Sequence, residues 1–485
     1  MTRRLSSLGE VSWNGTSWSS SGGDQVSIRL RIPTILMITV WLTVAGHGLS
    51  AINAQTVAGS PIVWVALGPS GAVLARVITT DLTCPPITLD STTQPMQVRA
   101  QPSPPDYPVL VCEATIPTGV TSASVAGQAL PLPKPSSKRI VVIGDAGCRL
   151  GKAQACNDPQ AWPFEQVANS AAAFQPDLVI HVGDLLYREE ACPIGNAGCA
   201  ASPFGYNFAA MSADLFTPAA ALLRAAPWVF TRGNHELCSR NGAAWFRLFD
   251  PRPIPATCQD FTDPYAIAAG GVQLLIFDSS NANDFEAQPD QVAIYAPQFA
   301  ALHNLAQGDA WLLTHRPMWI FGHAGIKNGM EQLFRDNPTL QAASQNTLPS
   351  NVQLVLSGHI HLLELLSFGG GRPPQFAVGN GGTLLDHTIT TPLAGLEIAG
   401  ATVATGAVID RLGFLTMELS GRDWIVTARD VKGAPQSTCT LSGASLTCLP
   451  VPIPTVAPHF LVLVAVGFIL FITLGIRRQQ SPRVS

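Results

Sequence analysis

Short apolar runs that end in polar residues recur along the middle of the chain. The runs cover residues 139–145, 176–184, 226–236, 272–280, 310–317 and 352–361. Apolar runs of this length are typical of buried strands, and a helical pattern around 163–174 separates the first two. Alternating strands and helices indicate an α/β fold, so we predict a layered β-sandwich flanked by helices over residues 139–432.

A different pattern precedes residue 135. Four β-type runs, at 61–67, 71–79, 95–101 and 107–116, are separated by clusters of Pro, Gly, Ser and Thr. This spacing predicts a small all-β sandwich domain over residues 55–135, followed by a linker at 130–138. The segment contains no histidine and no clustered acids, so we assign it no chemistry.

Two longer apolar segments lie towards the ends. Residues 32–46 follow Arg29 and Arg31 and lead into small residues, so 1–54 are predicted as an N-terminal extension and signal peptide. An uncleaved anchor is the alternative. Residues 460–476 are apolar and precede Arg477 and Arg478, so we predict a transmembrane helix over 459–477 and a cytoplasmic tail over 478–485. A buried core helix is the alternative there.

Export changes how the ten cysteines are interpreted, because an oxidising compartment favours disulfides. Ten cysteines allow many connectivities. Pairing nearest neighbours predicts Cys84–Cys112, Cys148–Cys156, Cys192–Cys199, Cys238–Cys258 and Cys439–Cys448. The last pair makes residues 433–458 a disulfide hairpin with a Pro-rich stalk. We therefore expect an exported protein on the outer face of the cell envelope, anchored by its C-terminal helix.

The amino-acid composition argues against several classes of protein. Only 12% of the residues are charged, about half of the ~25% usual in soluble proteins, and the net charge is −4. A coiled coil, a highly charged disordered chain and a strongly basic nucleic-acid binder are all disfavoured. We expect no nucleic-acid partner.

The polar residues that end the central strands form a coherent set. In chain order they are Asp145 in GDAG, Asp184 and Tyr187 in GDLLY, Asn234 and His235 in GNHE, His315 in LTH, and His359 and His361 in GHIH. Functional groups of α/β sheets collect at strand ends. Carboxylates, imidazoles and an amide suit two Fe, Mn or Zn ions. Two such cations about 3.5–4 Å apart clamp the oxygens of a displacement at phosphorus and lower the pKa of a water.

These blocks resemble the metallophosphoesterase superfamily, also called the calcineurin-like phosphoesterases. Within it they are similar to the purple acid phosphatase pattern of GDxG, GDxxY, GNH[DE], a strand histidine and GHxH, over residues 139–430. The resemblance implies hydrolysis of small phosphate esters by a hydroxide that bridges two metals. One departure from most relatives is Gly147, where they have the histidine of Asp-x-His. Tyr187 stands where purple acid phosphatases supply a tyrosine ligand, and a packing tyrosine is the alternative.

Carried over residue by residue, the resemblance implies a ligand set. The first metal, Fe(III), would be held by Asp145, Tyr187 and His361. The second, divalent metal (Fe, Zn or Mn) would be held by Asn234, His315 and His359. Asp184 would bridge both ions, and His235 would give a hydrogen bond to the phosphate or a proton to the leaving group. His323 would contact the substrate, with a surface histidine as the alternative.

Two other functions remain open. One is a phosphodiesterase for nucleotides or phospholipid headgroups on the same metal core, with substrate choice set by loops such as 188–212 and 280–296. The other is a catalytically silent envelope-binding module, which would predict erosion of the ligand set. Two further residues receive structural interpretations: His181 as a satisfied core histidine, and Asp386 as part of a turn in a Gly-rich loop.

Overall fold

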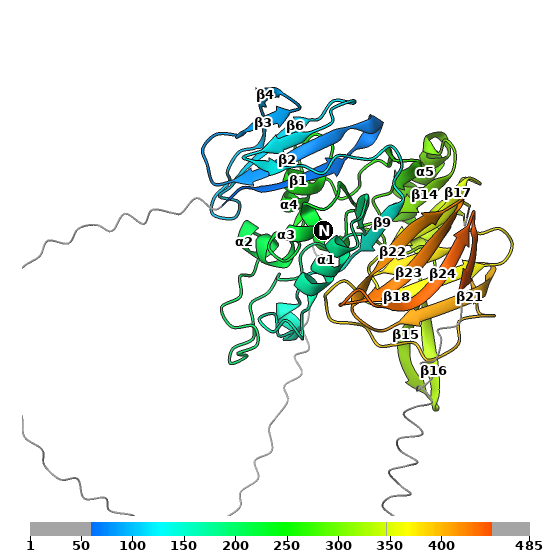
Figure 1. Ribbon diagram of the computed structural model, residues 1–485. Helices are drawn as coiled ribbons and strands as arrows, with labels where there is room; N and C mark the ends of the chain where they lie inside the picture. Colours follow the sequence, from blue (N-terminus) through cyan, green and yellow to red (C-terminus); the bar gives the residue numbers. More distant parts are fainter. Residues whose placement is uncertain (1–59, 346, 449–485) are drawn as a thin grey trace, which may run out of the picture. The chain divides into compact units, whose positions relative to one another are not determined.

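Two large sheets face each other across an apolar core in the computed structural model, which describes residues 60–345 and 347–448 (Figure 1). The predicted signal peptide, stalk and transmembrane helix lie outside these residues. Within the described residues, no helix has the length and apolar character needed to cross a membrane.

The first sheet has 11 strands and contains the first three predicted strands of the α/β domain. Its order is β25 (Ser445–Cys448), β24 (Pro435–Ser442), β23 (Asp423–Asp430), β22 (Gly413–Ser420), β9 (Arg139–Ile143), β10 (Leu178–His181), β11 (Trp228–Phe230), β1 (Ile62–Leu67), β2 (Val73–Thr79), β6 (Leu110–Thr115) and β5 (Gln97–Ala100). Strands β9, β10, β11 and β1 run parallel, and the other neighbours are antiparallel. The three motif-bearing strands therefore end at the same edge.

The second sheet has eight strands and the same central arrangement. Its order is β12 (Tyr265–Ala269), β13 (Val272–Ile276), β14 (Ala310–Leu313), β17 (Val352–Ser357), β19 (Gln375–Val378), β18 (Leu363–Phe368), β21 (Ala401–Ile409) and β20 (Glu397–Ile398). Strands β13, β14, β17 and β19 are parallel. A separate hairpin is formed by β15 (Ile320–Lys327) and β16 (Met330–Asp336).

Helices cover the outer faces. The first sheet is covered by α1 (Phe164–Ala173), α2 (Phe208–Met211), α3 (Ala220–Leu223) and α4 (Gly242–Ala244), and the second by α5 (Pro289–Leu305) and α6 (Pro338–Ser344). Because each sheet is covered on both faces, its central strands are apolar throughout rather than alternating. The predicted fold class, a layered β-sandwich flanked by helices, is confirmed. Residues 280–296, which we predicted as a loop, become helical from Pro289 onward.

The N-terminal residues form the predicted sandwich. A four-stranded sheet of β4 (Thr92–Pro95), β3 (Pro86–Leu89), β7 (Ala123–Val125) and β8 (Gln128–Ala129) shares an apolar core with β1, β2 and β6. Strand β1 also pairs with β11, with Ala66 opposite Trp228, so one sheet runs through both predicted domains. The predicted domain boundaries themselves stay predictions.

All five predicted disulfides are present: Cys84–Cys112, Cys148–Cys156, Cys192–Cys199, Cys238–Cys258 and Cys439–Cys448. None of the described cysteines is free. Cross-links in this number are typical of proteins that fold in an oxidising compartment, which supports export.

A buried arginine connects the N-terminal strands to the segment that follows β11. Arg76 on β2 is fully buried, and its Nη atoms donate to the carbonyl oxygens of Leu248 and Asp250, each at 2.5 Å. Its Nε donates to Glu113 on β6 at 2.8 Å. Removing this side chain would leave the Leu248 carbonyl without its donor, whereas Arg99 also donates to the Asp250 carbonyl at 2.7 Å and to Glu113 at 3.3 Å.

We expect Arg76→Met to lower the free energy of unfolding by about 1–3 kcal/mol, the cost of leaving a buried carbonyl without its donor. Urea unfolding measures the change. The exposed Arg422→Met is the matched control and should stay within about 0.5 kcal/mol of the wild type. Equal losses in both variants would show that Arg76 has no special role.

Candidate metal centre

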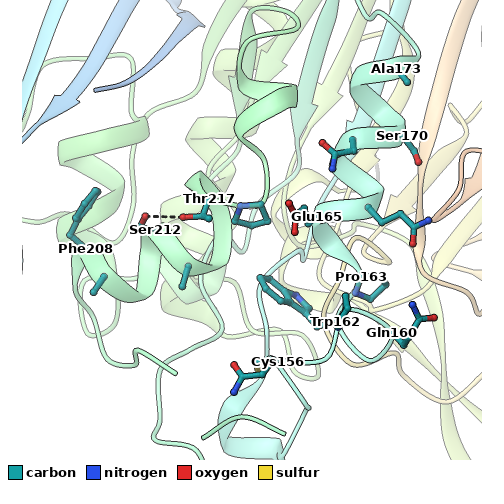
Figure 2. Close-up of a pocket in the computed structure, with 17 residues that line it drawn as sticks. Cys156, Gln160, Trp162, Pro163, Glu165, Ser170, Ala173, Phe208, Ser212 and Thr217 are labelled. Atoms are coloured by element: carbon teal, nitrogen blue, oxygen red, sulfur yellow. Dashed lines mark hydrogen bonds between the residues drawn. The ribbon is translucent and has the colours of Figure 1, made fainter. Parts of the chain in front are cut away.

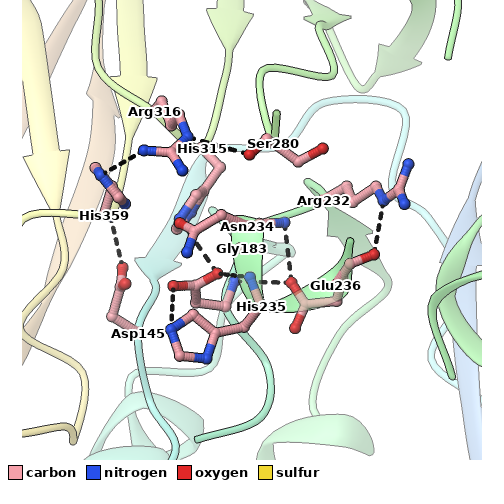
Figure 3. A network of polar contacts seen from close by, with 12 residues as sticks. Asp145, Gly183, Arg232, Asn234, His235, Glu236, Ser280, His315, Arg316 and His359 are labelled. Carbon is pink, nitrogen blue, oxygen red and sulfur yellow. Dashed lines mark hydrogen bonds and ion pairs between the residues drawn. The ribbon is translucent and has the colours of Figure 1, made fainter. Parts of the chain in front are cut away.

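The carboxyl ends of five parallel strands bring the predicted ligands together. Asp145 follows β9, Tyr187 lies beyond Asp184 after β10, and Asn234 begins a 3₁₀ turn after β11. His315 follows β14, and His359 and His361 follow β17. The hydrogen bonds below connect all seven residues into one cluster, part of which is seen in Figure 3.

Three of these residues have unusual backbone angles. Asp145, Asp184 and His359 have φ values of 54°, 55° and 75°, in the left-handed region that non-glycine residues rarely adopt. Such conformations concentrate at functional sites, where the surrounding fold holds them. Here each one turns the chain sharply at the end of a strand and directs its residue into the cluster.

Tyr187 lies at the centre of one half of the cluster. Its buried hydroxyl is 2.7 Å from Asp145 Oδ1, 2.8 Å from Asp184 Oδ2 and 2.9 Å from His361 Nε2. One phenol hydrogen cannot satisfy two carboxylates, even if His361 carries a proton. A cation among these atoms would satisfy the surplus lone pairs, and the donor set fits a hard metal ion.

His315 lies at the centre of the other half. Its Nδ1 donates to the Val182 carbonyl at 2.8 Å, which directs Nε2 towards Asn234 Oδ1 at 3.0 Å and Asp184 Oδ1 at 3.2 Å. A backbone carbonyl that fixes the tautomer in this way is typical of metal-binding histidines. Ligand atoms of Asp184, His315 and His359 all lie within 4.8 Å of one another. The residues therefore fit a second metal ion, with Asp184 shared.

The pKa values reflect the same crowding of charge. Burial would lower the pKa of His315, but the Asp184 carboxylate outweighs it and raises this pKa to about 9. Burial raises the pKa of Asp145, and burial with the Asp145 and Asp184 carboxylates raises that of Tyr187. Without metal, protons supply the positive charge that the cluster requires.

Position 147 has room only for a glycine. A Cβ atom at Gly147 would lie 2.6 Å from Asp214 Oδ2 and 2.8 Å from the Tyr187 backbone nitrogen. The chain segment that carries Tyr187 therefore fills the space that a larger side chain at 147 would need. A histidine at position 147 would therefore require this segment or Asp214 to move.

Residues 138–363 match the sequence model of the family described as calcineurin-like phosphoesterase. This part of the chain is a metallophosphoesterase domain. Hydrolysis of phosphate esters at a dinuclear metal centre is the chemistry of this superfamily, so the enzyme is a phosphoric ester hydrolase. Among curated proteins, no sequence matches the chain significantly.

Solved structures give weaker similarities. PhoD has a TM-score of 0.48 and 11% identity, over 81% of this chain and 93% of its own. GAP50, the anchor in the inner membrane complex of Plasmodium, has a TM-score of 0.34 and 13% identity over 64% and 90%. A predicted phosphoesterase from Streptococcus pneumoniae has a TM-score of 0.25 and 10% identity, over 65% of this chain and 99% of its own. These TM-scores are low and do not by themselves establish a shared fold.

His235 lies beside the phosphoesterase centre without replacing any ligand. Its ring centroid is 4.1 Å from that of Tyr187, and its Nε2 is 3.6 Å from Asp184 Oδ2. Glu189 Oε1 lies 3.3 Å from Nδ1, and Glu189 also pairs with Arg240. Arg240 Nη2 also lies 2.7 Å from Nδ1 and 3.0 Å from Nε2, so the imidazole is held between this guanidinium, Glu189 and the cluster.

The structure places His323 in a different set of contacts. It lies on β15, its Nδ1 is 2.8 Å from Glu331 Oε1, and its ring centroid is 5.4 Å from that of His387. Within the described residues, no hydrogen bond or ion pair joins it to the predicted ligands. Its substrate contact stays a prediction. Asp386, which we assigned to a turn, accepts a hydrogen bond from the His361 backbone nitrogen at 2.9 Å and so supports the site.

Two buried carboxylates hold the motif loops in place, and the sequence analysis missed both. Glu236 accepts from the backbone nitrogens of Asp184, Leu185 and Gly233 at 2.8–3.1 Å. Asp214 accepts from the backbone nitrogens of Cys148, Tyr187 and Arg188 at 2.7–3.1 Å. Glu236 could have been noticed as the last residue of GNHE. Asp214 lies 27 residues from Tyr187 and has no motif around it.

Asp284 and Arg316 flank His359 and were missed as well; Figure 3 labels Arg316 beside His359. Asp284 Oδ2 is 3.0 Å from His359 Nε2, Arg316 Nη1 is 2.9 Å from the same nitrogen, and the two side chains form an ion pair. Asn337 also donates to Asp284, at 2.9 Å. A carboxylate behind a histidine ligand orients the ring, and Asp284 comes from the loop that we expected to set substrate choice.

His181 is buried beneath the centre, and only one of its ring nitrogens is paired. Its Nδ1 accepts from the Gly183 backbone nitrogen at 3.2 Å, whereas Nε2 has no hydrogen-bond partner among the described residues. The prediction of a satisfied core histidine is therefore correct for one nitrogen and wrong for the other. Burial lowers the pKa of His181 to about 3, so the ring stays neutral in the folded state.

This shift makes stability depend on pH. Between pH 6.5 and 3 the unfolded chain binds a proton at His181 that the folded chain does not, so stability falls as pH falls. For His181→Gln, we expect the free energy of unfolding relative to wild type to rise by about 2 kcal/mol between pH 7 and pH 5. Urea unfolding of both chelator-treated proteins measures it. A difference that does not change with pH would contradict the buried neutral histidine.

Proposed function

We propose that the chain is a phosphatase of the purple acid phosphatase type. Asp145, Tyr187 and His361 would hold Fe(III). Asn234, His315 and His359 would hold a divalent ion, and Asp184 would serve both. The observation that carries the proposal is the position of the Tyr187 hydroxyl, 2.7–2.9 Å from Asp145, Asp184 and His361. A phenolate is a hard anionic ligand and favours a trivalent ion.

The residues of the chain would share the work of hydrolysis. When bound, two neighbouring metal ions supply positive charge at the phosphate oxygens and lower the pKa of a water molecule. His235 lies between Arg240, Glu189 and Asp184, and to act as the acid it would carry a proton on Nε2, the nitrogen that faces Asp184. As the water oxygen forms its bond to phosphorus, the ester P–O bond breaks and His235 gives this proton to the leaving oxygen. Each of the seven proposed ligand positions carries a residue that can bind a metal, which argues against a silent binding module.

The location of the enzyme belongs to the same proposal. We infer that it works outside the cytoplasm, supported by the five disulfides. Anchoring through residues 459–477 would keep it at the membrane, and it is supported by their sequence alone. The order of Ile-Pro-Thr, apolar segment and arginine pair resembles bacterial C-terminal sorting signals, which implies a tail open to processing.

Asp184→Asn should lower kcat/KM for p-nitrophenyl phosphate at least roughly 100-fold, because both ions would lose a shared ligand. Metal analysis of the purified variant should show loss of bound metal. Asp309→Asn, at an exposed position, is the control and should keep activity and metal. Full activity in Asp184→Asn would rule out the shared-ligand role. Parallel assays with bis(p-nitrophenyl) phosphate measure the diesterase alternative.

Tyr187→Phe tests the identity of the first metal. With Fe(III) bound to a phenolate, the wild-type protein should be pink to purple, and the variant should lose this visible absorption band. The readout is the visible spectrum together with the iron content of both proteins. A colourless wild type with two bound metals per chain would point to Zn or Mn at both positions.

A further inference from the structure

A cavity of about 230 Å³ opens beside Tyr187 and His235. Its walls carry three cationic residues, Arg149, Lys152 and Arg240, and its remaining lining includes Glu189 and Glu190. Because it touches the residue proposed to protonate the leaving group, it lies where the leaving group of a bound ester would extend. A larger cavity of about 1070 Å³, between α1 and residues 208–217 (Figure 2), contains none of the predicted site residues.

Two of the three cations are uncommitted. Arg240 is paired with Glu189 at 2.5 and 2.7 Å. Across residues 60–345 and 347–448, Arg149 and Lys152 form no ion pair and no side-chain hydrogen bond. The Arg149 guanidinium carbon lies 4.9 Å from the centroid of the Tyr187 ring. Glu190 likewise forms no ion pair with a described residue. The cavity therefore holds two cationic side chains and one acidic side chain that have no ion-pair partner among the described residues.

The loop that carries these cations is held in position. The Cys148–Cys156 disulfide closes it, and Cys148 is fully buried. The Arg149 backbone nitrogen donates to Gln154 Oε1 at 2.8 Å, and its carbonyl accepts from the Gln154 backbone nitrogen at 3.1 Å. A fixed loop presents its charges to a ligand with little loss of conformational entropy on binding.

We propose that this cavity is a subsite for an acidic group on the leaving group, bound by Arg149 and Lys152. The preferred substrates are small phosphate esters whose leaving group carries a carboxylate or a second phosphate. The inference rests on the proposed function and narrows its substrate class. A cavity of 230 Å³ is below the usual ~300–1,000 Å³ of ligand pockets, which favours a leaving group of a few atoms over a nucleoside.

Phosphate release from four matched esters tests the proposal with the metal-loaded enzyme. Ethyl phosphate has a neutral leaving group, phosphoethanolamine a cationic one, 2-phosphoglycolate a carboxylate, and ethylene glycol bisphosphate a second phosphate. We expect kcat/KM for at least one acidic ester to exceed that for ethyl phosphate about tenfold, the effect of one charge-assisted hydrogen bond. The better acidic ester identifies which acid the subsite prefers.

Charge variants locate the effect. Arg149→Gln and Lys152→Gln should each reduce the ratio of kcat/KM for the acidic ester over ethyl phosphate about threefold, because the two cations share the tenfold preference. Glu190→Gln removes the uncommitted acid and should increase that ratio. The exposed Arg224→Gln, which lies outside this cavity, is the matched control and should leave the ratio unchanged. Lys152 is exposed, so its variant remains informative if Arg149→Gln does not fold.

Equal kcat/KM for the acidic and neutral esters in the wild type would overturn the proposal, as would a ratio that neither Arg149→Gln nor Lys152→Gln changes. Hydrolysis of none of the esters would instead contradict the proposed function. Calorimetric Kd values for 2-phosphoglycolate, ethylene glycol bisphosphate and ethyl phosphate would then decide the subsite. An acidic-ester preference that Lys152→Gln reduces supports it, and equal affinities overturn it.

Discussion

Two carboxylates buried side by side set the main constraint on this structure. Asp145 and Asp184 are almost fully buried, and both contact the Tyr187 hydroxyl. Burying one unpaired carboxylate is costly, and a second one nearby adds Coulomb repulsion. A protonated His315, whose pKa the Asp184 carboxylate raises, relieves part of this cost, and metal ions would relieve it more completely. The site therefore combines a high demand for positive charge with the ligand types that transition metals accept.

Hydrogen bonds to buried carboxylates that are not ligands fix the backbone of the loops that carry the ligands. Glu236 and Asp214 each accept several backbone hydrogen bonds from different motif loops, so the loops after β9, β10 and β11 are tied to one another. Parallel strands then deliver the loops to one edge of each sheet. Of the left-handed residues at the strand ends, Asp184 donates its backbone nitrogen to Glu236, and His359 donates its backbone nitrogen to Asp145.

Sequence patterns predicted the strands and motif loops well, because each apolar run and its polar end are local features. The disulfides were also local, with sequence separations of 7 to 28 between partners. What the pattern could not supply were contacts between distant segments. Asp284 meets His359 across 75 residues, and β1 joins β11 through a pairing that no local motif marks. Asp214 supports the GDAG and GDLLY loops from a helical segment whose sequence gives no sign of this role.

The pairing of β1 with β11 has a practical consequence for anyone who isolates the hydrolase. A shortened chain that began at the linker would lack β1 and leave the β11 edge with unpaired backbone groups, which invites association between chains. It would also lack Arg76 and Arg99, whose guanidinium groups bind carbonyl oxygens between residues 246 and 252. The N-terminal β domain, to which we assign no chemistry, is thus a structural part of the hydrolase. Recombinant proteins should include it.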